Sequence, residues 1–118
     1  MKHPESRLQI VCFSWFRLQY PKIARLLFSV PNGGARNVTE AKIMKAEGVT
    51  AGVSDCILLI PKGPYSALCI EFKVENGKQT DLQKSWQELA EKHGNKYVIC
   101  RSFDSFIDIV EEYLSQNP

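Results

Sequence analysis

The sequence predicts an α/β protein in which one sheet is covered by helices, with elements in the order α-β-α-β-β-α-β-α. Three observations support this. The strand-like runs are almost entirely apolar, which is typical of a sheet buried on both faces. Other segments repeat apolar residues at helical spacing, and clusters of Gly, Pro and Asn separate the segments. The 118 residues suffice for one domain, 1–118, with a single core.

The N-terminal half begins with an expected helix over residues 4–18, where apolar residues recur every three or four positions. Its expected buried stripe comprises Leu8, Val11, Cys12, Trp15 and Phe16. A strand over 26–30 follows. A short helix over 39–47 comes next, with Asn37 or Thr39 as its cap.

The C-terminal half adds an amphipathic helix over 80–93, a strand over 97–100 and a last helix that starts at Ser102 or Asp104. The expected buried face of the 80–93 helix comprises Leu82, Trp86, Leu89 and Ala90.

Between these halves lie two β-like runs, 55–60 and 67–73, joined by a turn-rich segment, and this arrangement is typical of a hairpin. A hairpin centred near Gly63 places Asp55 opposite Glu71 on the neighbouring strand. Two carboxylates that close repel each other and shift each other's pKa. A divalent cation with a preference for oxygen ligands, such as Mg²⁺, resolves that repulsion.

Lys73 is expected beside this carboxylate pair. Side chains alternate along a strand, so Cys69, Glu71 and Lys73 share one face and the apolar residues between them face the core. The lysine could orient an attacking water or bind a phosphate. The alternative is that Asp55 caps a strand end while Glu71 and Lys73 form an ordinary surface pair.

The wider pattern resembles the PD-(D/E)xK nuclease superfamily and, within it, the virus-type replication-repair nuclease (VRR-Nuc) domain, including small phage members. The matching residues are Gly52-Val53-Ser54-Asp55, Ile70-Glu71-Phe72-Lys73, Gln83, Trp86, Gly94, Tyr97 and Val98, with the Pro31-to-Gly34 and Glu47-Gly48 segments. The resemblance spans nearly the whole chain. Ser54 stands where the family usually has a proline; that proline is structural rather than a metal ligand.

The resemblance implies a restriction-endonuclease-like mixed sheet flanked by helices. It also implies metal-dependent hydrolysis of DNA phosphodiester bonds, with Mg²⁺ as cofactor and Mn²⁺ as a substitute. The implied metal ligands are Asp55, Glu71 and the carbonyl of Phe72, and Lys73 is the implied catalytic lysine.

Two further residues are implied to complete the site. Gln83 would support it from the following helix, although Gln83 also has the spacing of a capping box with Thr80. Family members bring an acidic residue from the first helix, and Glu5 is the candidate here. The alternative for Glu5 is a charge that complements the helix N-terminus.

Candidate DNA contacts are Asn32, Gly33, Arg36 and Lys78. The loop 31–36 could present backbone amides and a guanidinium to phosphate, although a plain turn explains it equally well. The loop does not match the spacing of a nucleotide-binding P-loop, so no nucleotide cofactor is expected. A single exposed lysine such as Lys78 is more often simply solvated.

Composition sets outer limits on location and partners. The net charge of +2 and pI near 8.4 permit a polyanionic partner without demanding one. No signal peptide or membrane span is expected. The four cysteines form no C-x-x-C pair, and reduced core cysteines fit an intracellular protein. The resemblance to small phage members implies the cytoplasm of a bacterial or phage-infected cell.

The favoured hypothesis is a Mg²⁺-dependent endonuclease that acts on branched DNA, like a Holliday-junction resolvase, in replication, recombination or repair. By analogy with the family, it would act as a homodimer. The alternatives are a DNA-binding module of the same fold without turnover and a protein–protein adaptor with a coincidental motif.

Overall fold

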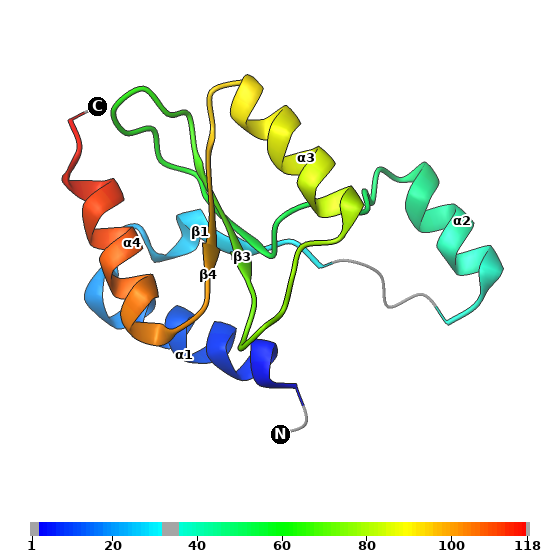
Figure 1. Ribbon diagram of the computed structural model, residues 1–118, viewed down its shortest axis with the longest axis horizontal. Coiled ribbons are helices and arrows are strands. Elements are labelled where there is room, and N and C mark those ends of the chain that lie inside the picture. Colours follow the sequence, from blue (N-terminus) through cyan, green and yellow to red (C-terminus); the bar gives the residue numbers. More distant parts are fainter. Residues whose placement is uncertain (1–2, 32–35, 118) are drawn as a thin grey trace.

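The computed structural model describes residues 3–31 and 36–117 and confirms the mixed sheet flanked by helices (Figure 1). The helices are α1 (Pro4–Gln19), α2 (Val38–Ala46), α3 (Asp81–Lys92) and α4 (Phe103–Ser115), and the strands are β1 (Leu27–Ser29), β2 (Cys56–Leu58), β3 (Leu68–Phe72) and β4 (Lys96–Cys100). A short 3-10 helix, η1 (Ala24–Leu26), leads into β1. The eight α and β elements follow the order expected from the sequence.

The sheet has the strand order β1-β2-β3-β4. Strands β1, β2 and β3 are antiparallel neighbours, whereas β3 and β4 run parallel because α3 connects them. In the β2–β3 hairpin, Cys56 pairs with Ile70 and Leu58 with Leu68. This is the register predicted from a hairpin centred near Gly63, and one step beyond it Asp55 faces Glu71.

One face of the sheet packs against α1 and α4 (Figure 1). Strand β3 gives this core its even-numbered side chains, as strand alternation predicted. The helices contribute Cys12, Phe13 and Phe16 from α1 and Phe106, Val110 and Tyr113 from α4. The predicted stripe of α1 was wrong at Val11, which is 47% exposed, because the helix turns Phe13 inward instead.

The other face of the sheet is covered only in part, by α3. Trp86 packs on Tyr97 with their ring centroids 6.2 Å apart, and Ala90 is buried. The predicted face of α3 was wrong at Leu82 and Leu89, which are 60% and 56% exposed. No other described element covers them.

Helix α2 stands apart from the sheet (Figure 1) and buries none of its side chains. Asn37 caps it by accepting a hydrogen bond from the amide of Glu40 at 2.8 Å, which resolves the two expected caps in favour of Asn37. Likewise Ser102, rather than Asp104, caps α4. Across residues 3–31 and 36–117, no helix has the length and apolar character needed to span a membrane.

Candidate active site

Asp55 directly precedes β2, and two hydrogen bonds fix its position. Its backbone carbonyl accepts a hydrogen bond from the amide of Val30 at 2.8 Å. Its carboxylate Oδ2 accepts one from the amide of Phe72 at 2.7 Å. Asp55 therefore continues the sheet with its backbone toward β1 and with its side chain toward β3.

The segment before Asp55 reaches this position through a close approach to α3. Gly52 has φ of +89°, and a Cβ at this position would lie 2.5 Å from the carbonyl oxygen of Leu82. Only glycine fits both restrictions. Ser54 is fully buried and donates its hydroxyl to the carbonyl of Cys56 at 3.2 Å.

Glu71 projects from β3 toward the α3 side of the sheet and is only 2% exposed. Its Oε2 accepts a hydrogen bond from Nε2 of Gln83 at 3.1 Å. Its Oε1 is buried and has no hydrogen-bond partner among the described residues. A buried carboxylate oxygen without a donor is unfavourable in a folded protein and marks a position where a ligand can bind.

The electrostatics of Glu71 agree with this geometry. Burial raises the pKa of Glu71 to about 8, and the Asp55 carboxylate adds to the shift through its charge and through a hydrogen bond that it accepts from the protonated Glu71. The ammonium of Lys73 opposes the shift, and Glu5 adds a smaller contribution. The carboxyl group therefore keeps its proton near neutral pH unless another positive charge compensates. The Asp55 charge thus shifts the pKa of Glu71 in the direction expected for two close carboxylates.

Lys73 and Glu5 lie close enough to Glu71 for their charges to affect its pKa. Lys73 follows β3 and is half-buried, and its amide donates to the carbonyl of Cys100 at 3.1 Å. Glu5, in the first turn of α1, is also half-buried. Gly77 lies against both, since a Cβ there would be 3.5 Å from Cδ of Lys73 and 3.6 Å from Oε2 of Glu5.

Gln83 fills both roles that the sequence left open. Its side-chain Oε1 accepts a hydrogen bond from the backbone amide of Thr80 at 2.9 Å, and its backbone amide donates one to Oγ1 of Thr80 at 3.2 Å. The capping box is therefore complete. The Nε2 of the same side chain donates to Glu71. The helix cap thus holds the amide group in place beside the carboxylate.

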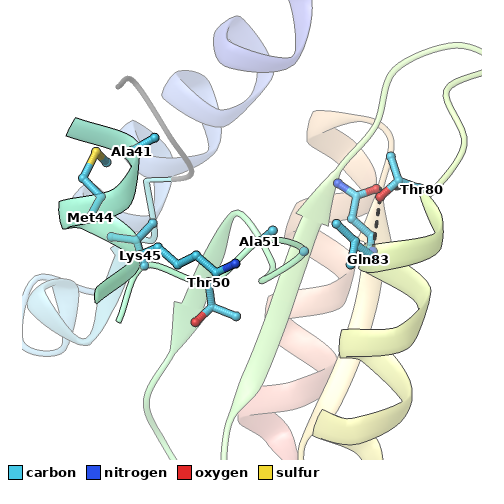
Figure 2. Close-up of a pocket in the computed structure, with 10 residues that line it drawn as sticks. Ala41, Met44, Lys45, Thr50, Ala51, Thr80 and Gln83 are labelled. Carbon is cyan, nitrogen blue, oxygen red and sulfur yellow. Dashed lines mark hydrogen bonds between the residues drawn. The ribbon is translucent and has the colours of Figure 1, made fainter. Parts of the chain in front are cut away.

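Gln83 also lines a groove of about 690 Å³ between α2 and the start of α3 (Figure 2). Met44 and Lys45 of α2 line one wall, and Thr80, Leu82 and Gln83 line the other. Through Gln83, which also bonds to Glu71, this open and largely apolar groove adjoins the carboxylate site.

The proposed DNA contacts do not all gather at this site. Arg36 is exposed just before α2, the helix that stands off from the sheet. Lys78 is in a hollow that it shares with Arg101. Asn32 and Gly33 lie outside the described residues.

A polar chain beside the site was not anticipated from the sequence. Nε2 of Gln79 donates to Oε1 of Gln87 at 2.8 Å and to the hydroxyl of Tyr97 at 3.3 Å. Burial raises the pKa of Tyr97 to about 12, and the nearby Glu71 and Asp55 carboxylates add to this shift. Tyr97 matched the family pattern, but isolated glutamines carry no periodic signal that reveals such a chain.

The donor set suits a cation that retains water ligands. No three His, Cys, Asp or Glu side chains within residues 3–31 and 36–117 come close enough together to hold a metal ion. The available donors are the two carboxylates, including the free oxygen of Glu71. Mg²⁺ commonly binds through one or two carboxylates and keeps several waters, so these residues fit it.

The fold and this carboxylate pair define a small α/β domain of the restriction-endonuclease-like type. The model of the VRR-NUC domain family matches residues 2–104. A solved structure, a VRR_NUC domain protein, is 28% identical with a TM-score of 0.84, and the match covers 99% of this chain and 93% of that chain. No curated protein matches the chain. The chain belongs to the VRR-NUC domain family, which supports a nuclease-type role.

Proposed function

We propose that this protein is a metal-dependent endonuclease that hydrolyses phosphodiester bonds in DNA. The observation that carries the proposal is the buried Oε1 of Glu71, which has no donor among the described residues although it lies beside Asp55. A purely structural carboxylate at this depth would be expected to have its hydrogen bonds satisfied. A bound cation would satisfy Glu71 and remove the repulsion from Asp55.

Asp55, Glu71 and the carbonyl of Phe72 would hold Mg²⁺, or Mn²⁺ in its place. When bound, the metal ion supplies positive charge to the phosphate and acidifies a bound water. The amide of Phe72 fixes the Asp55 carboxylate, so one of the two carboxylates is oriented before any ligand arrives.

The remaining side chains have distinct proposed roles. The ammonium of Lys73 orients the attacking water or contacts the scissile phosphate. Gln83 orients Glu71 through its 3.1 Å hydrogen bond. Glu5 adds negative charge close to Glu71 and would strengthen cation binding.

The proposed substrate is branched DNA, in particular a four-way junction, and the proposed context is replication, recombination or repair in the cytoplasm of a bacterial or phage-infected cell. Arg36 and Lys78, with Asn32 and Gly33, are the proposed DNA contacts. Basic side chains that contact phosphates make binding weaker as salt rises. A homodimer would present two sites related by a twofold axis, which suits a four-way junction.

A surface for that homodimer is available along α3. Leu82 and Leu89 are exposed, as are Phe28 of β1 and Leu59 after β2. Adjoining hollows share Trp86 and Leu89, so the apolar surface continues from α3 onto the open part of the sheet. Continuous exposed apolar surface of this kind is typical of interfaces.

Sedimentation velocity tests the dimer. Leu89→Glu should convert the protein to a monomer, because it places a charge in the middle of the apolar surface. Leu18→Glu is the matched control, since Leu18 is 85% exposed on α1. A monomeric wild-type protein at high micromolar concentration would contradict the proposed homodimer.

Cleavage assays test the activity itself. The protein is incubated with a four-way junction, a matched duplex and a flap, in Mg²⁺, in Mn²⁺ and in EDTA. We expect metal-dependent nicking with preference for the junction. DNA binding without cleavage in any metal would instead identify a non-catalytic DNA-binding module.

A further inference from the structure

The turn that follows β3 has a strained backbone. The amide of Gly77 donates to the carbonyl of Val74 at 2.9 Å and closes a turn over these four residues. Within it Glu75 adopts φ of +49°, a conformation that residues other than glycine rarely adopt. Such a conformation persists only where the surroundings hold it.

Arg101 provides that restraint. It comes directly after β4, and the pairing of Phe72 with Cys100 brings it beside the turn. Its Nη1 donates to the carbonyl of Glu75 at 3.2 Å and to the carbonyl of Gly77 at 2.8 Å. One guanidinium nitrogen therefore joins the strained residue to the last residue of the turn.

The turn also borders two residues of the candidate site. A Cβ added at Gly77 would lie 3.5 Å from Cδ of Lys73 and 3.6 Å from Oε2 of Glu5, so both side chains face this glycine across a gap of about one methyl group. Because Lys73 directly precedes the turn and its Cδ faces Gly77, a displacement of the turn would move the backbone that carries Lys73 and change the space around its stem. A misplacement of about 1 Å at a reacting group can reduce a rate about a hundredfold.

We propose that Arg101 is a positioning residue, which holds the Val74–Gly77 turn and thereby fixes the Lys73 ammonium relative to Asp55 and Glu71. The inference rests on the proposed nuclease function. It assigns Arg101 to the conformation of the site and not to DNA contact, although the side chain is exposed and carries a positive charge.

Lys78 provides a matched control for that charge. It lies in the same hollow as Arg101, and among the described residues its side chain makes no hydrogen bond to the turn. If Arg101 positions Lys73, Arg101→Ala should lower kcat by about tenfold to a hundredfold with little change in KM. Lys78→Ala should instead weaken DNA binding, which raises KM, and reduce the salt dependence of binding.

A rescue variant separates positioning from any other role of Arg101. Glu75→Gly removes the steric penalty of the positive φ, so the turn keeps its shape without the guanidinium. The double variant Arg101→Ala with Glu75→Gly should recover at least half of the reduction in kcat on a logarithmic scale. If Arg101 instead bound a DNA phosphate, the glycine would not restore activity.

Amide hydrogen exchange over residues 73–77 gives a readout without catalysis. Exchange should be faster in Arg101→Ala, unchanged in Lys78→Ala and slower again in the double variant. The proposal is overturned if Arg101→Ala changes only KM and salt dependence, if it changes nothing, or if Glu75→Gly restores neither kcat nor exchange protection. A wild-type protein that cleaves no DNA would refute the proposed function, while exchange would still decide whether Arg101 holds the turn.

Discussion

Glu71→Gln separates the stability of the folded chain from its proposed cation binding. Glutamine keeps the shape of the side chain, and its carbonyl oxygen can still accept the hydrogen bond from Gln83. Its amide nitrogen can donate to the Asp55 carboxylate. The substitution therefore removes a charge that is unfavourable without a metal ion and leaves the packing of β3 intact.

The pH dependence follows from the raised pKa of Glu71. The folded chain holds this proton more tightly than the unfolded chain, whose ordinary value is 4.5. Protonation of Glu71 therefore stabilises the folded chain fully below pH 4.5, and this stabilisation is lost as pH rises toward about 8. Full conversion of the shift gives on the order of 5 kcal/mol. Solvent screening and relaxation reduce this, so we expect a gain of about 1–2 kcal/mol for Glu71→Gln at pH 8.

Thermal unfolding in EDTA at pH 8 measures this gain. Glu71→Gln should raise Tm by roughly 4–8 °C relative to wild type. The difference in Tm should shrink as pH falls to 4.5. Adding Mg²⁺ should raise the Tm of the wild type but not that of Glu71→Gln. Glu88→Gln, at an exposed position of α3, is the control. A Glu71→Gln protein that is less stable than wild type at pH 8 in EDTA, or that is still stabilised by Mg²⁺, would refute the reasoning.

The other predictions concern the supports of the site. Asp55→Asn keeps an oxygen acceptor for the backbone amide at the end of β3, so stability should change by less than about 1 kcal/mol, while Mg²⁺ affinity in calorimetry falls at least about tenfold. Thr80→Ala and Gln83→Ala should each lower the free energy of unfolding in urea by about 1 kcal/mol, because each breaks the capping box; only Gln83→Ala should also slow cleavage, by about tenfold or more. Gly52→Ala should destabilise by about 2–4 kcal/mol through its clash with a backbone carbonyl of α3. Gly48→Ala, which has positive φ but open space, should lose only about 1 kcal/mol in the same titration; equal losses at the two glycines would contradict the close approach.

Local rules predicted the parts of the molecule on which the candidate site depends. Alternation along β3 separated the core side chains from Glu71, and the length of the hairpin connection set the register that brings Asp55 opposite it. Both rules involve neighbouring residues on two short strands. The capping-box spacing of Thr80 and Gln83 is equally local, and it placed Gln83 at the end of α3 that faces Glu71.

Contacts between distant segments were not predictable in this way. Helical spacing predicted that Leu82 and Leu89 share an apolar face, but it does not say whether the sheet extends far enough to cover them. The same limit applies to α2. Its cap residues predicted a helix, but they do not say that the helix packs on no other described element closely enough to bury a side chain. Arg101 reaches a turn 24 to 26 residues earlier in the chain, and no sequence pattern marks such a bond.

Cleavage of a labelled four-way junction in Mg²⁺ by wild type and by Glu71→Gln is the measurement that tests the central claim most directly. Wild type should nick the junction in Mg²⁺ and not in EDTA, and Glu71→Gln should be at least about a hundredfold slower although it is folded. Metal-dependent nicking by Glu71→Gln at the wild-type rate would contradict the assignment of Asp55 and Glu71 as the metal-binding pair.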